Sequence, residues 1–242
     1  MSLVPLRFET SDKSELVSQL LYGDHFKILE KRKNWSKIRL SFDDYEGFLD
    51  NKQYVEISEK EFQYLKSSKQ IYSTDLVEFV QDKNRQLLPV LLGSTLNCLG
   101  ILDHKVDGNS CTGIKPKNTL IETASLYLNT PYLWGGKSPF GIDCSGFTQM
   151  VYKVNGFKLL RDASQQATQG EVLSFIEESE PGDLAFFDNA DGEIIHVGII
   201  LKNNYIIHAH GSVRIDRLDQ SGIYNQELNK HTHKLRVIKK II

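Results

Sequence analysis

A cysteine stands where a glycine-containing loop runs into a helical pattern, and this feature constrains the chain most. Cys144 lies between Asp143 and Ser145-Gly146-Phe147, and apolar residues follow at helical spacing as far as Tyr152. Backbone N–H groups at a helix N-terminus, and the positive end of the helix dipole, favour the thiolate, which is the reactive form of cysteine. The sequence therefore predicts a nucleophilic cysteine at the start of a helix.

Strand patterns follow this helix. A second helix is predicted before it, over Thr119–Asn129, with Thr119 as N-cap and Glu122 as its capping-box partner. Helices first and strands afterwards indicate an α+β fold. The predicted antiparallel strands are Leu184–Phe187, Ile194–Leu201, Tyr205–Ala209 and Lys234–Ile238.

A tight turn at Lys202–Asn204 places two histidines on one face of the predicted hairpin. With the turn centred on Lys202, His196 and His208 stand directly opposite each other; with the centre one residue later, they are diagonal neighbours that still share a face. Either register gives what a cysteine peptidase needs, an imidazole base and a polar group that orients it. His196 is the predicted base and His208 the orienting residue, with His210 as the alternative on spacing alone.

Other roles for the cysteines and histidines are less well supported by the sequence. Zinc bound by Cys144, His196, His208 and His210 is disfavoured, because no Cys-x-x-Cys or His-x-x-x-His spacing occurs. No cofactor or metal is therefore expected. Cys98 and Cys111 are interpreted as small buried apolar residues, and the pair His231 and His233 as an exposed pair on a terminal segment.

Composition narrows the possible partners. The chain has 242 residues with 40% hydrophobic and 25% charged residues, and its net charge of -2 gives no basic stripe for nucleic acid. Three cysteines make no disulfide framework. Without a membrane-spanning run or a secretory signal, the sequence predicts a cytoplasmic monomer that binds neither nucleic acid nor membrane, although a trimmed leader stays possible.

The motifs together resemble those of the NlpC-type cell-wall cysteine peptidases, a bacterial branch of the papain-like fold. Their order and spacing between about Thr119 and Ile215 carry the resemblance. In chain order the motifs are Thr130-Pro131-Tyr132-Leu133-Trp134-Gly135-Gly136, Asp143-Cys144-Ser145-Gly146-Phe147, Arg161-Asp162-Ala163-Ser164-Gln165-Gln166, Pro181-Gly182-Asp183-Leu184, His196-Val197-Gly198-Ile199 and Ile207-His208-Ala209.

The N-terminal part is similar to the bacterial SH3-like modules that precede this domain in some family members. Leu16–Gly23 and Asp44–Leu49 carry that similarity, within a stretch of short strands. The predicted division is therefore a small all-β SH3-like barrel over 1–57, a diverged second SH3-like module or linker layer over 58–115, and a papain-like catalytic domain over 116–242.

The resemblance implies roles for individual residues. Cys144 is the nucleophile, His196 the base and His208 the third polar residue, which decides between His208 and His210. Family members of this architecture cleave the bond after γ-D-glutamate in peptidoglycan stem peptides whose N-terminal L-alanine has a free amine. The implied substrate-binding residues are Asp143, Ser145, Trp134, Tyr45, Glu15 and Ser164. Asp143 also suits a plain helix N-cap.

Two other functions stay open on the sequence. One is an amidase or acyltransferase that uses the same cysteine and histidines on a lipid or another amide. The other is a catalytically inactive module that binds wall peptides. The joint presence of Cys144, His196 and His208 disfavours the inactive module, and an acid suited to an ammonium group disfavours a lipid substrate.

Overall fold

The computed structural model describes residues 1–242, and its internal contacts divide the chain into two compact units. The first unit comprises Met1–Ile114 together with the short segment Trp134–Pro139, and the second comprises Lys115–Leu133 and Phe140–Ile242. The finer division of residues 1–115 into two modules stays a prediction.

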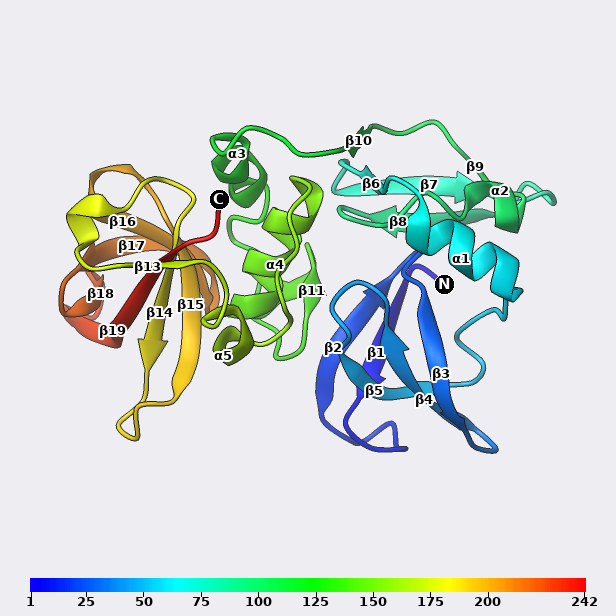
Figure 1. The fold of residues 1–242 in the computed structure, drawn as a ribbon, viewed down its shortest axis with the longest axis horizontal. Coiled ribbons are helices and arrows are strands. Elements are labelled where there is room, and N and C mark those ends of the chain that lie inside the picture. Colours follow the sequence, from blue (N-terminus) through cyan, green and yellow to red (C-terminus); the bar gives the residue numbers. More distant parts are fainter. The chain divides into compact units, whose positions relative to one another are not determined.

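An antiparallel sheet with the strand order β2-β1-β5-β4-β3 begins the first unit (Figure 1). Alternation along these strands buries Leu6, Ile38 and Leu49 completely, so one face of the sheet supplies a core. The strands are β1 (Leu3–Arg7), β2 (Leu16–Leu21), β3 (Phe26–Lys31), β4 (Trp35–Leu40) and β5 (Glu46–Asp50).

Residues 58–115 also form regular structure. Helix α1 (Glu59–Ser67) begins with a capping box, in which Ser58 and Glu61 satisfy each other's backbone N–H groups. A second core gathers around Tyr22, Val80 and Val90. The other elements are β6 (Ile71–Ser73), β7 (Val77–Gln81), β8 (Leu87–Leu91), α2 (Leu99–Leu102), β9 (Lys105–Val106) and β10 (Ser110–Thr112), in the sheets β8-β7-β9 and β10-β6.

Close backbone contacts hold the segment Trp134–Pro139 within the first unit. Gly135 has a φ of +75°, and a Cβ there would lie 2.2 Å from the Leu16 carbonyl oxygen, so only glycine fits. The Lys137 N–H, at the start of β11 (Lys137–Ser138), donates to Gln19 Oε1 over 2.8 Å.

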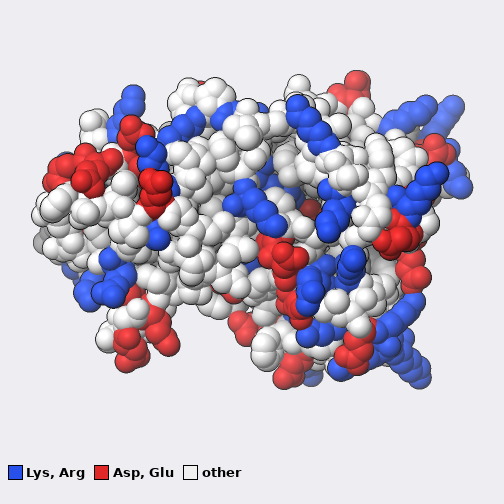
Figure 2. Space-filling model, in the orientation of Figure 1, with Lys and Arg blue, Asp and Glu red and all other residues white.

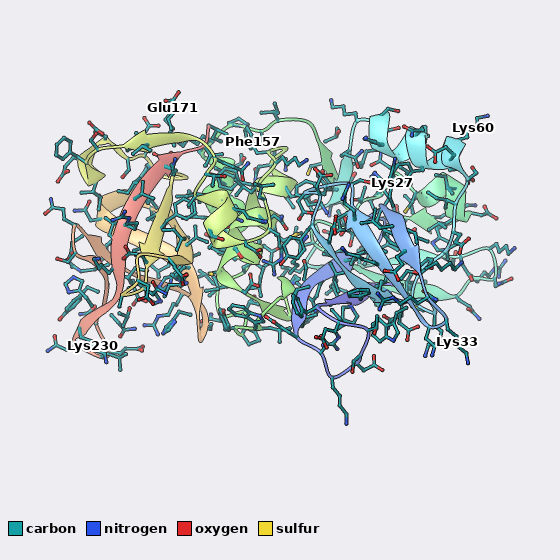
Figure 3. The ribbon with its side chains drawn as sticks, turned by 60° about the horizontal axis from the view of Figure 1, so that its bottom comes forward. Lys27, Lys33, Lys60, Phe157, Glu171 and Lys230 are labelled. Carbon is teal, nitrogen blue, oxygen red and sulfur yellow. The ribbon has the colours of Figure 1, made fainter.

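The second unit contains a closed ring of antiparallel strands in the order β14-β15-β16-β17-β18-β19, and β13 pairs with the C-terminal end of β19 (Figure 1). Lys230, at the start of β19, and Glu171, which pairs with its far end, lie at opposite ends of this barrel (Figure 3). The strands are β13 (Glu171–Leu173), β14 (Leu184–Asp188), β15 (Ile194–Ile200), β16 (Tyr205–His210), β17 (Ser212–Asp219), β18 (Gly222–Asn225) and β19 (Lys230–Lys240).

Helix α4 (Cys144–Val154) packs against β15 and β16, and all its residues are buried. Helices α3 (Thr119–Ser125) and α5 (Ala163–Gln166), strand β12 (Gly141–Ile142) and the short 3-10 turns Ile176–Glu178 and Lys202–Asn204 complete the unit. The predicted α+β fold is therefore confirmed.

The predicted capping of α3 is wrong. Asn118 is the N-cap, and it makes no side-chain cap hydrogen bond. The Thr119 hydroxyl instead donates to the Pro116 carbonyl, and it also bonds to Asn155 Oδ1, which lies at the end of α4. A contact with another element has replaced the local cap, and Glu122 is left in the first helical turn.

The hairpin of β15 and β16 adopts the second of the two predicted registers. Gly198 pairs with His208 and Ile200 with Ile206, so His196 and His208 are diagonal neighbours on one face. The ladder stops at Gly198, although β15 begins at Ile194 and β16 continues to His210. The two strands therefore part beside His196.

The surface carries both signs of charge. On the face drawn in Figure 2, basic and acidic side chains are interspersed, in keeping with 29 Lys and Arg against 31 Asp and Glu. No helix combines the length and the apolarity that crossing a bilayer requires.

Gly198→Ala should destabilise the barrel, because a Cβ at this position would lie 2.7 Å from Ile206 Cδ1 and 2.9 Å from His208 Cβ. Overpacking of this kind costs about 1–3 kcal/mol of unfolding free energy, which urea denaturation measures. Gly100→Ala is the control, because a Cβ there meets nothing within 4 Å. Equal stability of the two variants would contradict the close packing between β15 and β16.

Candidate active site

Cys144 occupies the first position of α4, where Asp143 caps the helix. The Asp143 carboxylate accepts the Gly146 N–H over 2.6 Å. Burial, followed by the charge of Asp143, raises the pKa of the Cys144 thiol to about 12, although the Val197 and Ser145 backbone N–H groups act in the opposite direction. The resting thiol is therefore protonated, and the thiolate expected from the helix N-terminus requires a base.

His196 and His208 meet on the inner face of the barrel. His196 Nε2 lies 2.8 Å from His208 Nδ1, with the rings nearly perpendicular, and both side chains are buried. Burial, followed by the neighbouring histidines 208, 233 and 210, holds the pKa of His196 well below its usual value. Val197 directs its backbone N–H at the Cys144 sulfur, so His196, the predicted base, directly precedes the backbone partner of the thiol.

Asp216 continues the hydrogen-bonded series that begins with His196 and His208, and the sequence patterns did not predict this role. Its Oδ2 lies 3.0 Å from His208 Nε2, and Arg214 donates to both of its oxygens, over 2.7 Å from Nε and 3.1 Å from the second guanidinium nitrogen. Asp216 pairs with Ile206 and Arg214 with His208, so alternation puts all four on one face. In the sequence, Arg214 and Asp216 alternate with the apolar residues Val213 and Ile215. This pattern could have indicated a charged pair on the same strand face.

His233 also joins the cluster, and its predicted exposure is wrong. It is half-buried, its ring stacks on His196 with centroids 4.2 Å apart, and its Nδ1 lies 2.9 Å from Thr232 Oγ1. His210 lies 6.4 Å from His196 between ring centroids and is exposed. His231 is exposed as predicted, where it contacts Asp219. The extra length of β19 carries His233 into the barrel, whereas the predicted strand began only at Lys234.

Three of these histidines have the spacing of a metal site. One ring nitrogen each of His196, His208 and His233 lies within 4.8 Å of the others. The rings of His196 and His233 are only 24° from parallel, however, so their lone pairs do not converge on one point. His196 Nε2 and His208 Nδ1 also bond to each other. A metal would require these rings to rotate and this hydrogen bond to break.

The residues on both sides of Cys144, Asp143 and Ser145, both bond to the buried Arg161. Arg161, only 1% exposed, donates over 2.6 Å and 3.0 Å to the two oxygens of Asp143, and over 2.9 Å to Ser145 Oγ. Arg161 begins the motif Arg161–Gln166, but the sequence predicted no role for it. Asp143 is thus both helix cap and partner of a buried cation, whereas Ser164 lies exposed on α5.

The other predicted substrate residues belong to the first unit. Trp134, which is 61% exposed, donates its indole N–H to Glu15 Oε1 over 2.6 Å. Tyr45 lies directly before β5 and packs in part against the core of that sheet. The structure therefore brings Glu15 and Trp134 together.

Tyr132 is a further polar group near the thiol. Burial, followed by the proximity of Cys144 and Asp143, raises the pKa of its phenol, so the hydroxyl stays a neutral hydrogen-bond donor. Its backbone N–H donates to Gly211, at the turn that follows β16. Tyr132 belongs to the motif Thr130–Gly136, in which the sequence predicted a substrate-binding role for Trp134 alone.

Family models match both ends of the chain. Residues 129–236 match the NlpC/P60 family, and residues 6–53 match the bacterial dipeptidyl-peptidase SH3 domain. The chain contains an NlpC/P60 domain over residues 129–236. It is a cysteine peptidase with an N-terminal SH3 domain, as the sequence motifs predicted.

Several relatives of this NlpC/P60 peptidase are named dipeptidyl-peptidases. It is 39% identical over 114 residues to the γ-D-glutamyl-L-lysine dipeptidyl-peptidase of Bacillus subtilis, an alignment that covers 45% of this chain and 38% of the relative. It is 27% identical over 250 residues to dipeptidyl-peptidase 6 of Lysinibacillus sphaericus, covering 89% of each.

Its fold matches that of an NlpC/P60 family protein from Bacillus cereus. The crystal structure of that protein superposes with a TM-score of 0.81 at 20% identity, covering 99% of this chain and 97% of the other. The likeness extends over both units and establishes the fold.

Arg161→Ala should strongly destabilise the peptidase, because it leaves the buried Asp143 carboxylate without its cation. Removal of one member of a buried pair costs about 3–5 kcal/mol, which urea denaturation measures. Arg32→Ala is the control, because Arg32 binds Glu30 through two hydrogen bonds at the exposed surface, where solvent screening leaves such pairs little effect on stability. Similar losses in both variants would mean that burial of the Arg161 pair contributes nothing.

Proposed function

We propose that this peptidase hydrolyses the bond between γ-D-glutamate and the diamino acid in peptidoglycan stem peptides that begin with a free L-alanine. The observation that carries the proposal is the Cys144 thiol, which accepts the Val197 N–H on β15, while the preceding residue, His196, is hydrogen-bonded to His208. The name of the B. subtilis relative, γ-D-glutamyl-L-lysine dipeptidyl-peptidase, supplies the substrate class.

The proposed mechanism is acyl transfer through Cys144. His196 takes the proton from the thiol, and the thiolate sulfur attacks the γ-glutamyl carbonyl carbon. The C–N bond then breaks, and the imidazolium of His196 returns the proton to the leaving amine. Water, deprotonated by His196, hydrolyses the thioester, which releases the L-alanyl-γ-D-glutamate carboxylate and restores the thiol.

A neutral starting pair suits this sequence of steps. The pKa of Cys144 lies above and that of His196 below its ordinary value, both chiefly because of burial. The neutral imidazole can accept the thiol proton before the thiolate attacks, and the charges that form are stabilised by groups already in place. The Cys144 N–H and the neutral phenol of Tyr132 are the proposed donors to the oxyanion.

The free amine of the substrate requires a negative or aromatic environment. Asp143 and Ser145 are the proposed contacts in the second unit, and Arg161 already compensates part of the Asp143 charge. Glu15 carries a carboxylate that pairs with the neutral Trp134 indole, so its charge is free to meet an ammonium group. Trp134, Tyr45 and Ser164 complete the proposed set.

The same framework could serve an amidase or acyltransferase. A free-amine peptide is favoured by the exposed indole and carboxylate of Trp134 and Glu15, which suit an ammonium better than an acyl chain. An inactive binding module is disfavoured because it would need no buried, polarised histidine pair. Action on released wall peptides in the cytoplasm, by a monomer, remains our prediction.

Incubation with L-Ala-γ-D-Glu-L-Lys and with its diaminopimelate counterpart should release L-Ala-γ-D-Glu from at least one, as measured by mass spectrometry. Cys144→Ala should reduce release by roughly 10³-fold or more, because no other group can form the thioester. Cys111→Ala is the matched control and should keep the wild-type rate, since Cys111 lies half-buried on β10. Intact peptides after prolonged incubation with wild-type protein would refute the proposed bond.

Acetylation of the alanine amine should block cleavage of the same peptides. The acetyl group removes the positive charge that Asp143 is proposed to bind, and kcat/KM should fall by about 10²-fold or more. Comparison of the two kcat/KM values by liquid chromatography tests this. Equal values would exclude recognition of the amine while leaving the cysteine mechanism intact.

A further inference from the structure

Four side chains form one hydrogen-bonded line inside the barrel. His196 Nε2 is hydrogen-bonded to His208 Nδ1 over 2.8 Å, and His208 Nε2 to Asp216 Oδ2 over 3.0 Å. Arg214 donates hydrogen bonds to both oxygens of Asp216. The line comes from three adjacent strands, β15, β16 and β17. The inner three members are buried, so water does not compete for these bonds.

The proton positions along the line follow from its last member. An ionised carboxylate can only accept hydrogen bonds. Burial opposes ionisation of Asp216, but the hydrogen bonds from His208 and Arg214 outweigh it and lower the pKa of this carboxyl. His208 Nε2 must therefore carry the hydrogen that reaches Asp216.

The hydrogen on His208 Nε2 also determines the direction of the bond between His208 and His196. A neutral imidazole has one N–H, so a hydrogen on His208 Nε2 leaves Nδ1 as an acceptor. Burial, the largest influence, lowers the pKa of His208 and keeps the ring neutral. His196 Nε2 must then donate to His208 Nδ1, and the lone pair of His196 is left on Nδ1.

We infer that Asp216 is a positioning residue that fixes the tautomers of His208 and His196 in series, so that His196 presents a bare Nδ1 as the base. This inference rests on the proposed role of His196. Without the carboxylate, the bond between the two rings can form with either ring as donor. The reverse arrangement places the hydrogen of His196 on Nδ1, where it cannot accept the thiol proton.

The neighbouring groups do not replace Asp216. His208 makes its hydrogen bonds to His196 and Asp216 alone. The other titratable groups close to the two rings are His210 on β16 and His233 on β19, which contact them by ring packing, while Phe187 on β14 adds an apolar wall. Arg214 is the remaining charged group, and it bonds to Asp216 and not to either ring.

The direct test is ¹⁵N NMR of the histidine rings in the full-length protein. The wild type should show the hydrogen on Nε2 of both His196 and His208. In Asp216→Asn the side-chain amide can donate to His208 Nε2, so both rings should carry their hydrogen on Nδ1. With this change kcat should fall by about 10²- to 10⁴-fold while KM stays within about threefold, as expected for a base in the wrong tautomer.

Two variants separate this role from simple structural support. Asp219→Asn makes the same change at the exposed contact between Asp219 and His231, and it should alter neither tautomers nor kcat. Asp216→Glu keeps a carboxylate and should restore the Nε2–H form of both rings, together with most of kcat.

A hydrogen on Nδ1 of either ring in the wild type would overturn the inference, and this measurement does not depend on the folding of any variant. An Asn variant that keeps both Nε2–H tautomers and the wild-type kcat would also overturn it. Because the NMR readout needs no substrate, failure of the proposed peptide cleavage is distinguishable from failure of the tautomer relay.

Discussion

The antiparallel register between β15 and β16 is the constraint on which the site depends. It pairs Gly198 with His208, so that His196 lies diagonally across from its partner and both rings enter the barrel. A slip of one residue would turn the alternate side chains to the opposite face. Gly198 makes the approach possible, because any side chain there would collide with His208. Beyond this pair the strands part, which leaves the Val197 N–H directed at the thiol.

Burial then sets the chemistry of the groups that this register assembles. It raises the pKa of Cys144 and lowers that of His196, so the resting site holds a neutral thiol and a neutral imidazole. The buried charges are instead those with strong partners, Asp143 with Arg161 and Asp216 with Arg214 and His208. Burial therefore favours the neutral forms of the thiol and the imidazole, whereas the charged groups beside them have ionic partners.

Sequence patterns anticipated the parts of this arrangement that are local. The helical pattern after Cys144 is α4, and the alternation along 194–210 put His196 and His208 on one face before the register was known. The capping of α3 was wrong because Thr119 bonds across to Asn155, a partner that no local pattern contains. His233 and Arg161 were misjudged for the same reason, since each acts through residues distant in the chain.

The sequence by itself determined the NlpC/P60 resemblance and the α+β fold, and it predicted Cys144 and His196 as nucleophile and base, because these follow from periodicity, turn position and motif order within short windows. Only the tertiary structure decided the hairpin register, the burial of His233 and the bonds that Asp216 and Arg161 make. Closure of the barrel by β19, which pairs with both β18 and β14, joins strands that are distant in the chain, and burial inside it favours the neutral form of His196. Long-range pairing and desolvation leave no periodic trace in the sequence, so these features required the folded chain.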